Sequence, residues 1–458
     1  MGRRHALAGA SVFSTTATAM CSGLLQQLGC SAAAVVVDGD AERRLGDRTA
    51  AESSKANDEG QLQSAIPDYS ARGPYSVRRL PKLEHTCVSC FPRCVGDACL
   101  LSIDAYVPTA PPPLPDAMFP PPGDISPLSS HELSRGPYPL AVLTSGFLVD
   151  AEQYSSYARR LCSWGYVVLQ YNKRDSVGVA GGNVLDDVVS AAMVGDLITW
   201  AQSDVLLSQL ICTGGGGTGG RCSGDSSSSS NGVGTGVHGG RPRNMGAASN
   251  IGGGYQYDIS IGGVGGGGGE VGGVYLVGHS RGGKISMLEA ASDPRVKAVC
   301  LLDPVDNTVY APLGEGFPSA VAAMRDCRGG GPPLLVVGGR YGGDCAPQGS
   351  NYLEFLKEAS PDSWGVEVSA GHFQFLDNAS FMQRAVCEDG KVADSQVREL
   401  SQALMVAHAE TVFRGVPRKL ALRKTLATLE NSWGGGAFGS GMKGDSGALP
   451  WLMLQDGV

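Results

Sequence analysis

Residues 274–288 read VYLVGHSRGGKISML, which places a serine between glycines directly after a run of apolar residues. Within this stretch, residues 278–282 (GHSRG) fit the pattern G-x-S-x-G. Between a strand and a helix, the small residues of this pattern permit a sharp turn that exposes the serine hydroxyl. Residues 274–277 indicate the strand and residues 282–292 the helix. The stretch therefore predicts that Ser280 is a nucleophile; the alternative is a polar residue in an ordinary tight turn.

Strand-like and helical segments alternate along most of the chain. Short apolar runs indicate strands, and apolar residues three or four positions apart indicate helices. The predicted strands are residues 99–108, 137–146, 166–172, 274–280, 296–304, 332–339 and 364–371, and the predicted helices are residues 151–165, 183–210, 282–292, 350–360 and 393–413. This alternation predicts an α/β fold with a mostly parallel sheet and helices on both faces. The serine turn points to the α/β-hydrolase fold in particular.

The composition changes outside these segments. Residues 38–80 are polar, with many charged residues, several serines and two prolines, and we interpret them as a linker. Residues 213–273 contain mostly glycine and serine, which bury little surface, and they predict a disordered insert. A single hydrolase domain is expected over residues 81–430, interrupted by this insert. Residues 431–458 form a glycine-rich tail.

Residues 1–37 have the composition of a targeting segment. They include two early arginines and many serine, threonine and alanine residues, but no acidic residue. This composition is typical of an organelle transit peptide, whereas a secretory signal, the alternative, needs a longer apolar centre. The segment predicts import into a plastid or mitochondrion.

The net charge and the length of the apolar runs indicate which classes of partner to expect. The chain has 458 residues and a net charge of −8, without a cluster of lysine and arginine, which argues against nucleic acid as a partner. No uninterrupted apolar run reaches the roughly 18 residues that a bilayer-spanning helix requires. We expect a small-molecule substrate and, at most, peripheral contact with membranes.

Four of the 13 cysteines, namely Cys87, Cys90, Cys94 and Cys99, lie close together. Their spacing matches no zinc or iron–sulfur pattern, although four thiolates can bind a metal. We therefore expect free thiols or local disulfides here, with a metal site as the alternative.

A serine nucleophile needs a base, and the chain has seven histidines. His372 follows the last predicted strand, where the chain order serine, acid, histidine of α/β-hydrolases places the base. His279 adjoins the serine and is expected to point away from it. The other histidines lie in the N-terminal segment, ahead of the main sheet, in the insert or within the last helix, and they are His5, His85, His131, His238 and His408.

The acid that orients the histidine must also lie at a strand end. Asp303 ends the predicted strand 296–304, and Asp344 follows the strand 332–339. Asp306 is a weaker third candidate. Both leading strand ends belong beside the histidine loop, so the residues by themselves leave the choice open.

Five motifs resemble the chlorophyllases, which are serine esterases of the α/β-hydrolase fold. They occur in the family order over roughly residues 99–415, apart from the insert, and they read SGFLVDAEQYSSYARRLCSWGYVV (145–168), VGHSRGGKISML (277–288), LLDPVDNT (301–308), CAPQGSNYLEF (345–355) and AGHFQFLDN (370–378). The resemblance implies that Asp303 is the acid. Platelet-activating-factor acetylhydrolases are also similar here, with the acid 23 residues after the serine.

This resemblance also implies an activity. Chlorophyllases cleave the propionate ester of chlorophyll to chlorophyllide and phytol in the chloroplast, without a metal or organic cofactor. The alternatives are a general carboxylesterase or lipase of the same fold and a non-catalytic protein that binds porphyrins or lipids.

An oxyanion hole completes the predicted site. Its backbone N–H donors are expected at Arg281, after the nucleophile, and at Phe147, in the loop after an earlier strand. That loop contains Ser145-Gly146-Phe147, whereas the family usually has His-Gly-Phe; the alternative is a strand-ending turn. Phe147, Leu148, Phe373 and Phe375 are candidate substrate-contacting residues, and each could equally be ordinary core.

Overall fold

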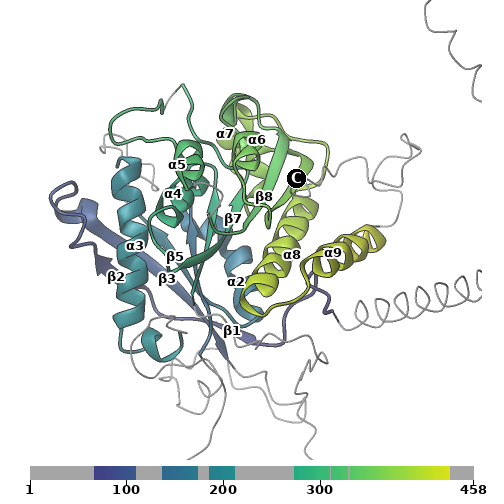
Figure 1. Ribbon diagram of the computed structural model, residues 1–458, viewed down its shortest axis with the longest axis horizontal. Helices are drawn as coiled ribbons and strands as arrows, with labels where there is room; N and C mark the ends of the chain where they lie inside the picture. The colour runs from purple at the N-terminus through teal and green to yellow at the C-terminus, as the bar shows by residue number, and fades with distance from the viewer. Residues whose placement is uncertain are drawn as a thin grey trace, which may run out of the picture. The chain divides into compact units, whose positions relative to one another are not determined.

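The computed structural model describes residues 66–109, 137–173, 185–211, 273–309, 311–327 and 331–433 (Figure 1). Contacts within the chain define two units, residues 1–60 and 61–458, and every described residue belongs to the second. The predicted targeting segment, residues 38–65 of the predicted linker, residues 213–272 of the insert and the tail from residue 434 lie outside the described residues.

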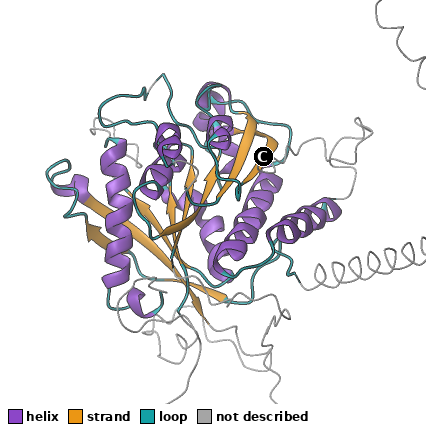
Figure 2. Ribbon diagram, viewed as in Figure 1, coloured by secondary structure: helices purple, strands orange, loops and turns teal. Residues whose placement is uncertain are grey.

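The described residues form a mixed sheet of nine strands (Figure 2). The strand order is β1-β3-β5-β4-β6-β7-β8-β9, and β2 pairs with β3. The pairs from β5 through β4 and on to β9 are parallel, whereas β3 runs antiparallel to β1, β2 and β5. The strands are β1 (Ser76–Arg79), β2 (Leu83–Thr86), β3 (Leu100–Thr109), β4 (Leu140–Thr144), β5 (Val167–Asn172), β6 (Val274–His279), β7 (Val296–Leu302), β8 (Leu334–Tyr341) and β9 (Trp364–Gly371).

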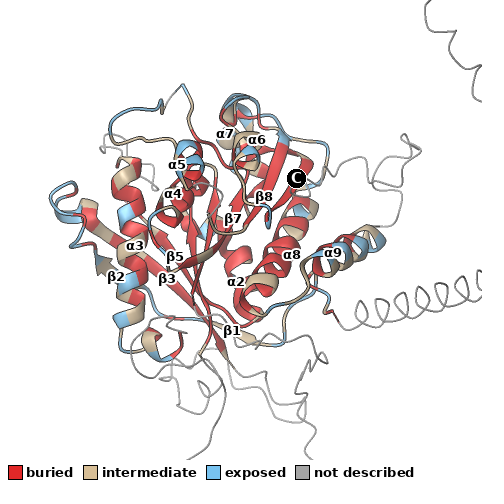
Figure 3. Cartoon of the chain, in the orientation of Figure 1, coloured by how far each residue is buried: buried red, intermediate tan, exposed pale blue. Residues whose placement is uncertain are grey.

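Helices cover both faces of this sheet, and each face has its own apolar core (Figures 1 and 3). One core contains residues of α3 (Asp187–Ser203), α4 (Arg281–Ala290), α5 (Ala320–Asp326) and α6 (Tyr352–Lys357). The other contains residues of α2 (Ser155–Ser163), α8 (Asp394–Phe413) and α9 (Arg418–Ser432). Central strands buried on both faces are expected to be mostly apolar, and β4 and β6 are apolar up to their last residues, with every residue buried. The predicted α/β fold is confirmed.

The predicted linker is wrong for residues 66–80. Residues 76–79 form β1, which pairs with β3 from Ser76 opposite Thr109 to Arg79 opposite Tyr106. Tyr69 and Leu80 are buried. The charged residues that suggested a solvated segment are compatible with a strand at the edge of a sheet, where charged side chains discourage pairing with other chains.

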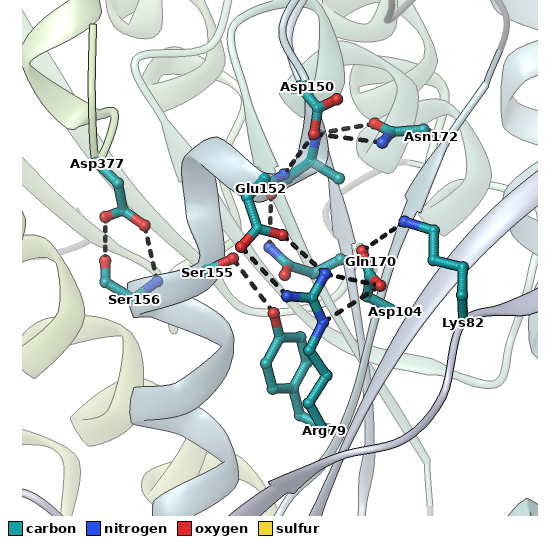
Figure 4. Close-up of polar contacts among 12 residues, drawn as sticks. Arg79, Lys82, Asp104, Asp150, Glu152, Ser155, Ser156, Gln170, Asn172 and Asp377 are labelled. Carbon is teal, nitrogen blue, oxygen red and sulfur yellow. Dashed lines mark hydrogen bonds and ion pairs between the residues drawn. The ribbon is translucent and has the colours of Figure 1, made fainter. Parts of the chain in front are cut away.

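Arg79 links this edge strand to the loop region ahead of α2 (Figure 4). Its guanidinium donates to both carboxylate oxygens of Glu152, at 3.2 and 2.8 Å, and pairs with buried Asp104 at 2.9 Å. Lys82 also contacts Asp104, at 2.9 Å. Because Glu152 belongs to the 3₁₀ helix η2 (Ala151–Tyr154), these ion pairs connect β1 and β3 to the segment that directly follows the loop of residues 145–150.

In the described residues, helices α5, α7 (Phe381–Val386) and α9 were not predicted. The first two have seven and six residues, too few to display a helical period. The predicted helix 183–210 is shorter in the structure, because α3 ends at Ser203 and the short 3₁₀ helix η3 (Leu207–Gln209) follows. Across the described ranges, no helix combines the length and the apolar character that spanning a membrane would need.

The clustered cysteines form local disulfides, Cys87–Cys90 and Cys94–Cys99. This is one of the two outcomes expected for them in preference to a metal site. A third disulfide, Cys345–Cys387, joins segments 42 residues apart in the sequence and was not predicted.

Candidate active site

Ser280 lies at a sharp turn between β6 and α4. Its φ and ψ are 56° and −128°, a strained combination for a residue with a side chain. A Cβ atom on Gly278 would lie 2.3 Å from the carbonyl oxygen of Gly282, and one on Gly282 would lie 2.2 Å from that of Thr144. Both glycines are therefore required by close backbone contacts, and the predicted strand-to-helix turn is present.

The imidazole of His372 lies between Ser280 and Asp303. Its Nε2 atom is 2.9 Å from Ser280 Oγ, and its Nδ1 atom is 2.6 Å from Asp303 Oδ2. Because a carboxylate only accepts, Nδ1 carries the proton and the Nε2 of the neutral ring accepts from the serine hydroxyl. The other oxygen of Asp303 accepts from the amide of Gly339 at 2.9 Å. Asp303 is fully buried and His372 nearly so, which keeps this hydrogen-bonded chain away from bulk water.

The other two acids do not lie against the histidine. Asp344 is exposed in the 3₁₀ helix η4 (Gly343–Cys345), and no ion pair joins it to His372 among the described residues. Asp306 accepts from Ser319 Oγ at 2.6 Å and from the amide of Ala320 at 2.7 Å, at the start of α5. Of the three sequence candidates, the structure places Asp303 in contact with His372.

Backbone strain is concentrated at this site. In the described parts of the chain, the non-glycine residues with positive φ are Leu148 (54°), Ser280 (56°) and Asp303 (40°). Leu148 belongs to the loop after β4, Ser280 to the turn after β6 and Asp303 to the end of β7. Such conformations cost about 1–3 kcal/mol each and persist where the surrounding structure imposes them.

The loop after β4 packs directly on the nucleophile. A Cβ atom on Gly146 would lie 3.2 Å from Ser280 Cβ, so the neighbouring Phe147 is close to the serine. The guanidinium of Arg281 lies over the Phe147 ring, 5.7 Å from its centroid. The main chain of Arg281 starts α4, where the N–H groups and the helix dipole favour negative charge. Arg281 follows Ser280 in the chain and the loop that carries Phe147 packs on the serine, so both residues predicted as oxyanion donors lie near Ser280.

Buried charges anchor the first turn of α4. Asp187, at the start of α3, accepts from Arg281 Nε at 2.7 Å and contacts Lys284 Nζ at 2.8 Å. Arg281 also donates to the carbonyl of Leu185. All three charged side chains are buried, so the two cations depend on Asp187 for compensation. Sequence reasoning missed Asp187, which lies in an ordinary helix-start sequence.

A second hydrogen-bonded chain connects the loop after β4 to the histidine loop. The amide of Gly146 donates to Tyr154 Oη at 3.3 Å, and that oxygen is 2.8 Å from His279 Nδ1. His279 Nε2 donates to the carbonyl of His372 at 2.9 Å, so its Nδ1 accepts from the tyrosine hydroxyl. Burial, and secondarily electrostatic repulsion whenever nearby His372 is protonated, holds the pKa of His279 well below its ordinary value. His279 therefore stays neutral, and its side chain engages Tyr154 and the backbone.

We predict that Tyr154→Phe lowers kcat about tenfold with little change in KM, because it disconnects the loop that carries Phe147 from the loop that carries His372. Steady-state kinetics on one ester substrate measures this split. Tyr106→Phe is the control: Tyr106 is equally buried, and its hydroxyl bonds to Ser155 at 3.2 Å. Equal losses of kcat in both variants would contradict a positioning role for Tyr154.

A cavity of about 270 Å³ opens beside Ser280 and His372. Phe147 and Phe373 line it, as predicted from the sequence. Leu148 is 50% exposed and is not among the lining residues, so its predicted contact with the substrate stays a prediction. The prediction is wrong for Phe375, which is fully buried in the core. Lining residues that sequence reasoning missed include Lys284, Cys345 and Val386.

Comparison with known proteins supports the resemblance seen in the motifs. Residues 268–428 match the family model described as Chlorophyllase. The chain is also 28% identical over 170 residues to chlorophyllase-2 of Arabidopsis thaliana, which covers 32% of this chain and 51% of that protein. The chain thus matches about half the length of this curated relative. The family match includes Ser280, Asp303 and His372, and the predicted relationship is confirmed. This part of the chain, a little over a third of its length, is therefore similar to the chlorophyllase family.

Proposed function

We propose that this protein is a serine carboxylic-ester hydrolase and that its substrate is chlorophyll, cleaved to chlorophyllide and phytol. The observation that carries the proposal is the continuous hydrogen-bonded chain from Ser280 through His372 to Asp303, at the wall of an open cavity. The substrate is inferred from the family and from the name of the relative.

In the proposed mechanism, Ser280 Oγ attacks the ester carbonyl while His372 Nε2 takes its proton. The imidazolium that forms is stabilised by the buried carboxylate of Asp303. His372 then gives the proton to the departing alcohol, which leaves an acyl group on Ser280. A water molecule, deprotonated by His372, attacks this acyl-enzyme, and the acid is released as Ser280 regains its proton.

The negative charge on the former carbonyl oxygen needs donors at fixed positions. The amides of Arg281 and Phe147 are proposed to supply them. Asp187 holds the side chain of Arg281, and the Arg281 guanidinium lies against the ring of Phe147. The donors are therefore held in place before the reaction starts.

The size of the cavity bears on the substrate. About 270 Å³ accommodates the reacting ester group and part of its substituents, but a tetrapyrrole with a phytyl chain extends beyond such a volume. We propose that most of the chlorophyll lies outside the cavity, over the apolar residues around its opening. The same volume would enclose a small ester completely, and this favours a general carboxylesterase as the second candidate.

We expect the purified protein to release chlorophyllide from chlorophyll a in detergent, detected because loss of the phytyl chain moves the pigment into the aqueous phase. A panel of short p-nitrophenyl esters is assayed in parallel, with Ser280→Ala as the blank for each substrate. Efficient cleavage of the short esters with chlorophyll left intact would replace the proposed substrate by the general-esterase alternative.

A further inference from the structure

Helix α7 exposes large apolar side chains. None of its six residues, Phe381–Val386, is buried. Phe381 is 83% exposed, Met382 69% and Val386 66%. Met382 and Val386 are four positions apart and therefore share one face of the helix. A monomer in water gains nothing from such a face, and contiguous exposed apolar surface is characteristic of interaction sites.

This helix lies at the mouth of the active-site cavity. Val386 is one of the lining residues, and the following residue, Cys387, forms a disulfide with Cys345, which also lines the cavity. The end of α7 is thus covalently attached to the cavity wall. In Figure 3, α7 is coloured exposed and intermediate along its length.

Two further loops contribute exposed apolar residues to the same opening. Phe147 lines the cavity and is 42% exposed, and Leu148 follows it. Val309 is 84% exposed and directly follows Thr308, another lining residue. We call these residues the apolar rim; it consists of Phe147, Leu148, Val309, Phe381, Met382 and Val386. They account for more than half of the large apolar residues exposed in the described part of the chain.

None of the six rim residues is charged, and the exposed residues Asp344, which lines the cavity, and Glu388, just after Cys387, are both acidic. Arg384 is the charged residue of α7, and it is paired with Asp389 at 3.0 Å and with Asp394. A surface of this kind complements an uncharged or zwitterionic partner and offers no particular attraction to an anionic one.

We propose that the apolar rim docks on a lipid surface and that an ester whose alcohol is embedded in the lipid reaches Ser280 directly from it. The inference rests on the proposed function. A protein partner or a second copy of this chain seated on the rim would cover the opening and keep substrate from the serine. A lipid surface covers the same apolar residues and at the same time delivers a substrate that is insoluble in water.

The test is sedimentation of the full chain with phosphatidylcholine vesicles, comparing the wild type with a Phe381→Asp, Met382→Asp double variant. Both residues are exposed and neither lines the cavity, so the fold and the cavity stay intact. We expect the partition coefficient to fall at least about tenfold in the double variant, because two apolar contacts are replaced by charges. Raising the salt concentration is expected to leave the binding of the wild type unchanged, since none of the rim residues is charged.

Val205→Asp is the matched control. Val205 is 81% exposed and lies just beyond the end of α3, a helix of 17 residues whose start contacts Arg281. At 1.5 Å per residue, it is about 25 Å along the helix from that contact. This variant is expected to bind vesicles like the wild type. An equal loss of vesicle binding in the control and in the double variant would contradict docking through the rim.

Activity separates a failure of this inference from a failure of the proposed function. The double variant is expected to hydrolyse a short water-soluble ester at the wild-type rate but a vesicle-embedded ester about tenfold more slowly. If the wild type cleaves the soluble ester without binding vesicles, or elutes as a dimer that the double variant disrupts, lipid docking is overturned. If it cleaves neither ester, the proposed function itself is wrong.

Discussion

Ser280→Ala is expected to lower kcat about a million-fold, as loss of the serine does in comparable triads. The serine Oγ is the proposed nucleophile, and without it no acyl-enzyme forms. The described hydrogen bond of its side chain is the one to His372, so its loss should disturb the fold little. The expected result is therefore an inactive protein whose melting temperature stays within a few degrees of the wild type.

Two measurements check this expectation. Single-turnover kinetics records the loss of the chemical step, and a fluorophosphonate probe, which reacts with activated serines, should label the wild type but not the variant. Ser286→Ala is the control, because Ser286 is buried in α4 and its hydroxyl has no hydrogen-bond partner in the described structure. Near-wild-type activity in Ser280→Ala would show that the turn holds an ordinary serine.

Ser280 and His372 could be predicted because the sequence signal for each lies within one short segment. Ser280 is recognisable from a glycine on each side, and the structure gives the reason: a Cβ at either glycine would collide with backbone. His372 could be found from the few histidines that follow a strand. Both inferences use residues within one strand and its turn.

The sequence pattern could not decide which aspartate orients His372. Asp303 and Asp344 both follow strands next to each other in the sheet, β7 and β8. What distinguishes them is the backbone: the strained turn of Asp303 aims its carboxylate at His372 and Gly339, whereas Asp344 lies in an exposed helical turn. Periodicity and composition carry no information on a single φ angle.

Contacts between distant segments were missed for the same reason. Tyr154 meets His279 across 125 residues, and Asp187 meets Arg281 across 94. Neither residue stands out in its own segment, since Tyr154 resembles a core tyrosine and Asp187 resembles a helix-start aspartate. Similarly, α7 is too short for a helical period, so its exposed apolar face was not predicted.

Asp303→Asn is expected to lower kcat about ten-thousandfold while the fold is retained. An asparagine can keep the hydrogen bond from the amide of Gly339 through its side-chain oxygen. Its side-chain NH₂ group then faces His372 Nδ1 and donates to it. The imidazole is driven to the tautomer with the proton on Nε2, which cannot accept the proton of Ser280.

The substitution suits the backbone at this position. Asparagine is among the residues that best tolerate positive φ, and residue 303 has a φ of 40°. Replacing a fully buried carboxylate by a neutral amide also removes a charge from the interior, so thermal unfolding should show an unchanged or raised melting temperature. A large loss of kcat without a loss of stability would separate a catalytic role from a structural one.

Asp344→Asn is the matched comparison, because Asp344 lines the same cavity but is exposed. We expect its kcat to stay within about threefold of the wild type, since an exposed carboxylate without an ion pair to His372 cannot fix the tautomer. The two variants are assayed on the same ester across the same pH range. If Asp344→Asn were the inactive variant and Asp303→Asn the mild one, the acid would have to act from the loop after β8, and the hydrogen bond between Asp303 and His372 would have no part in proton transfer.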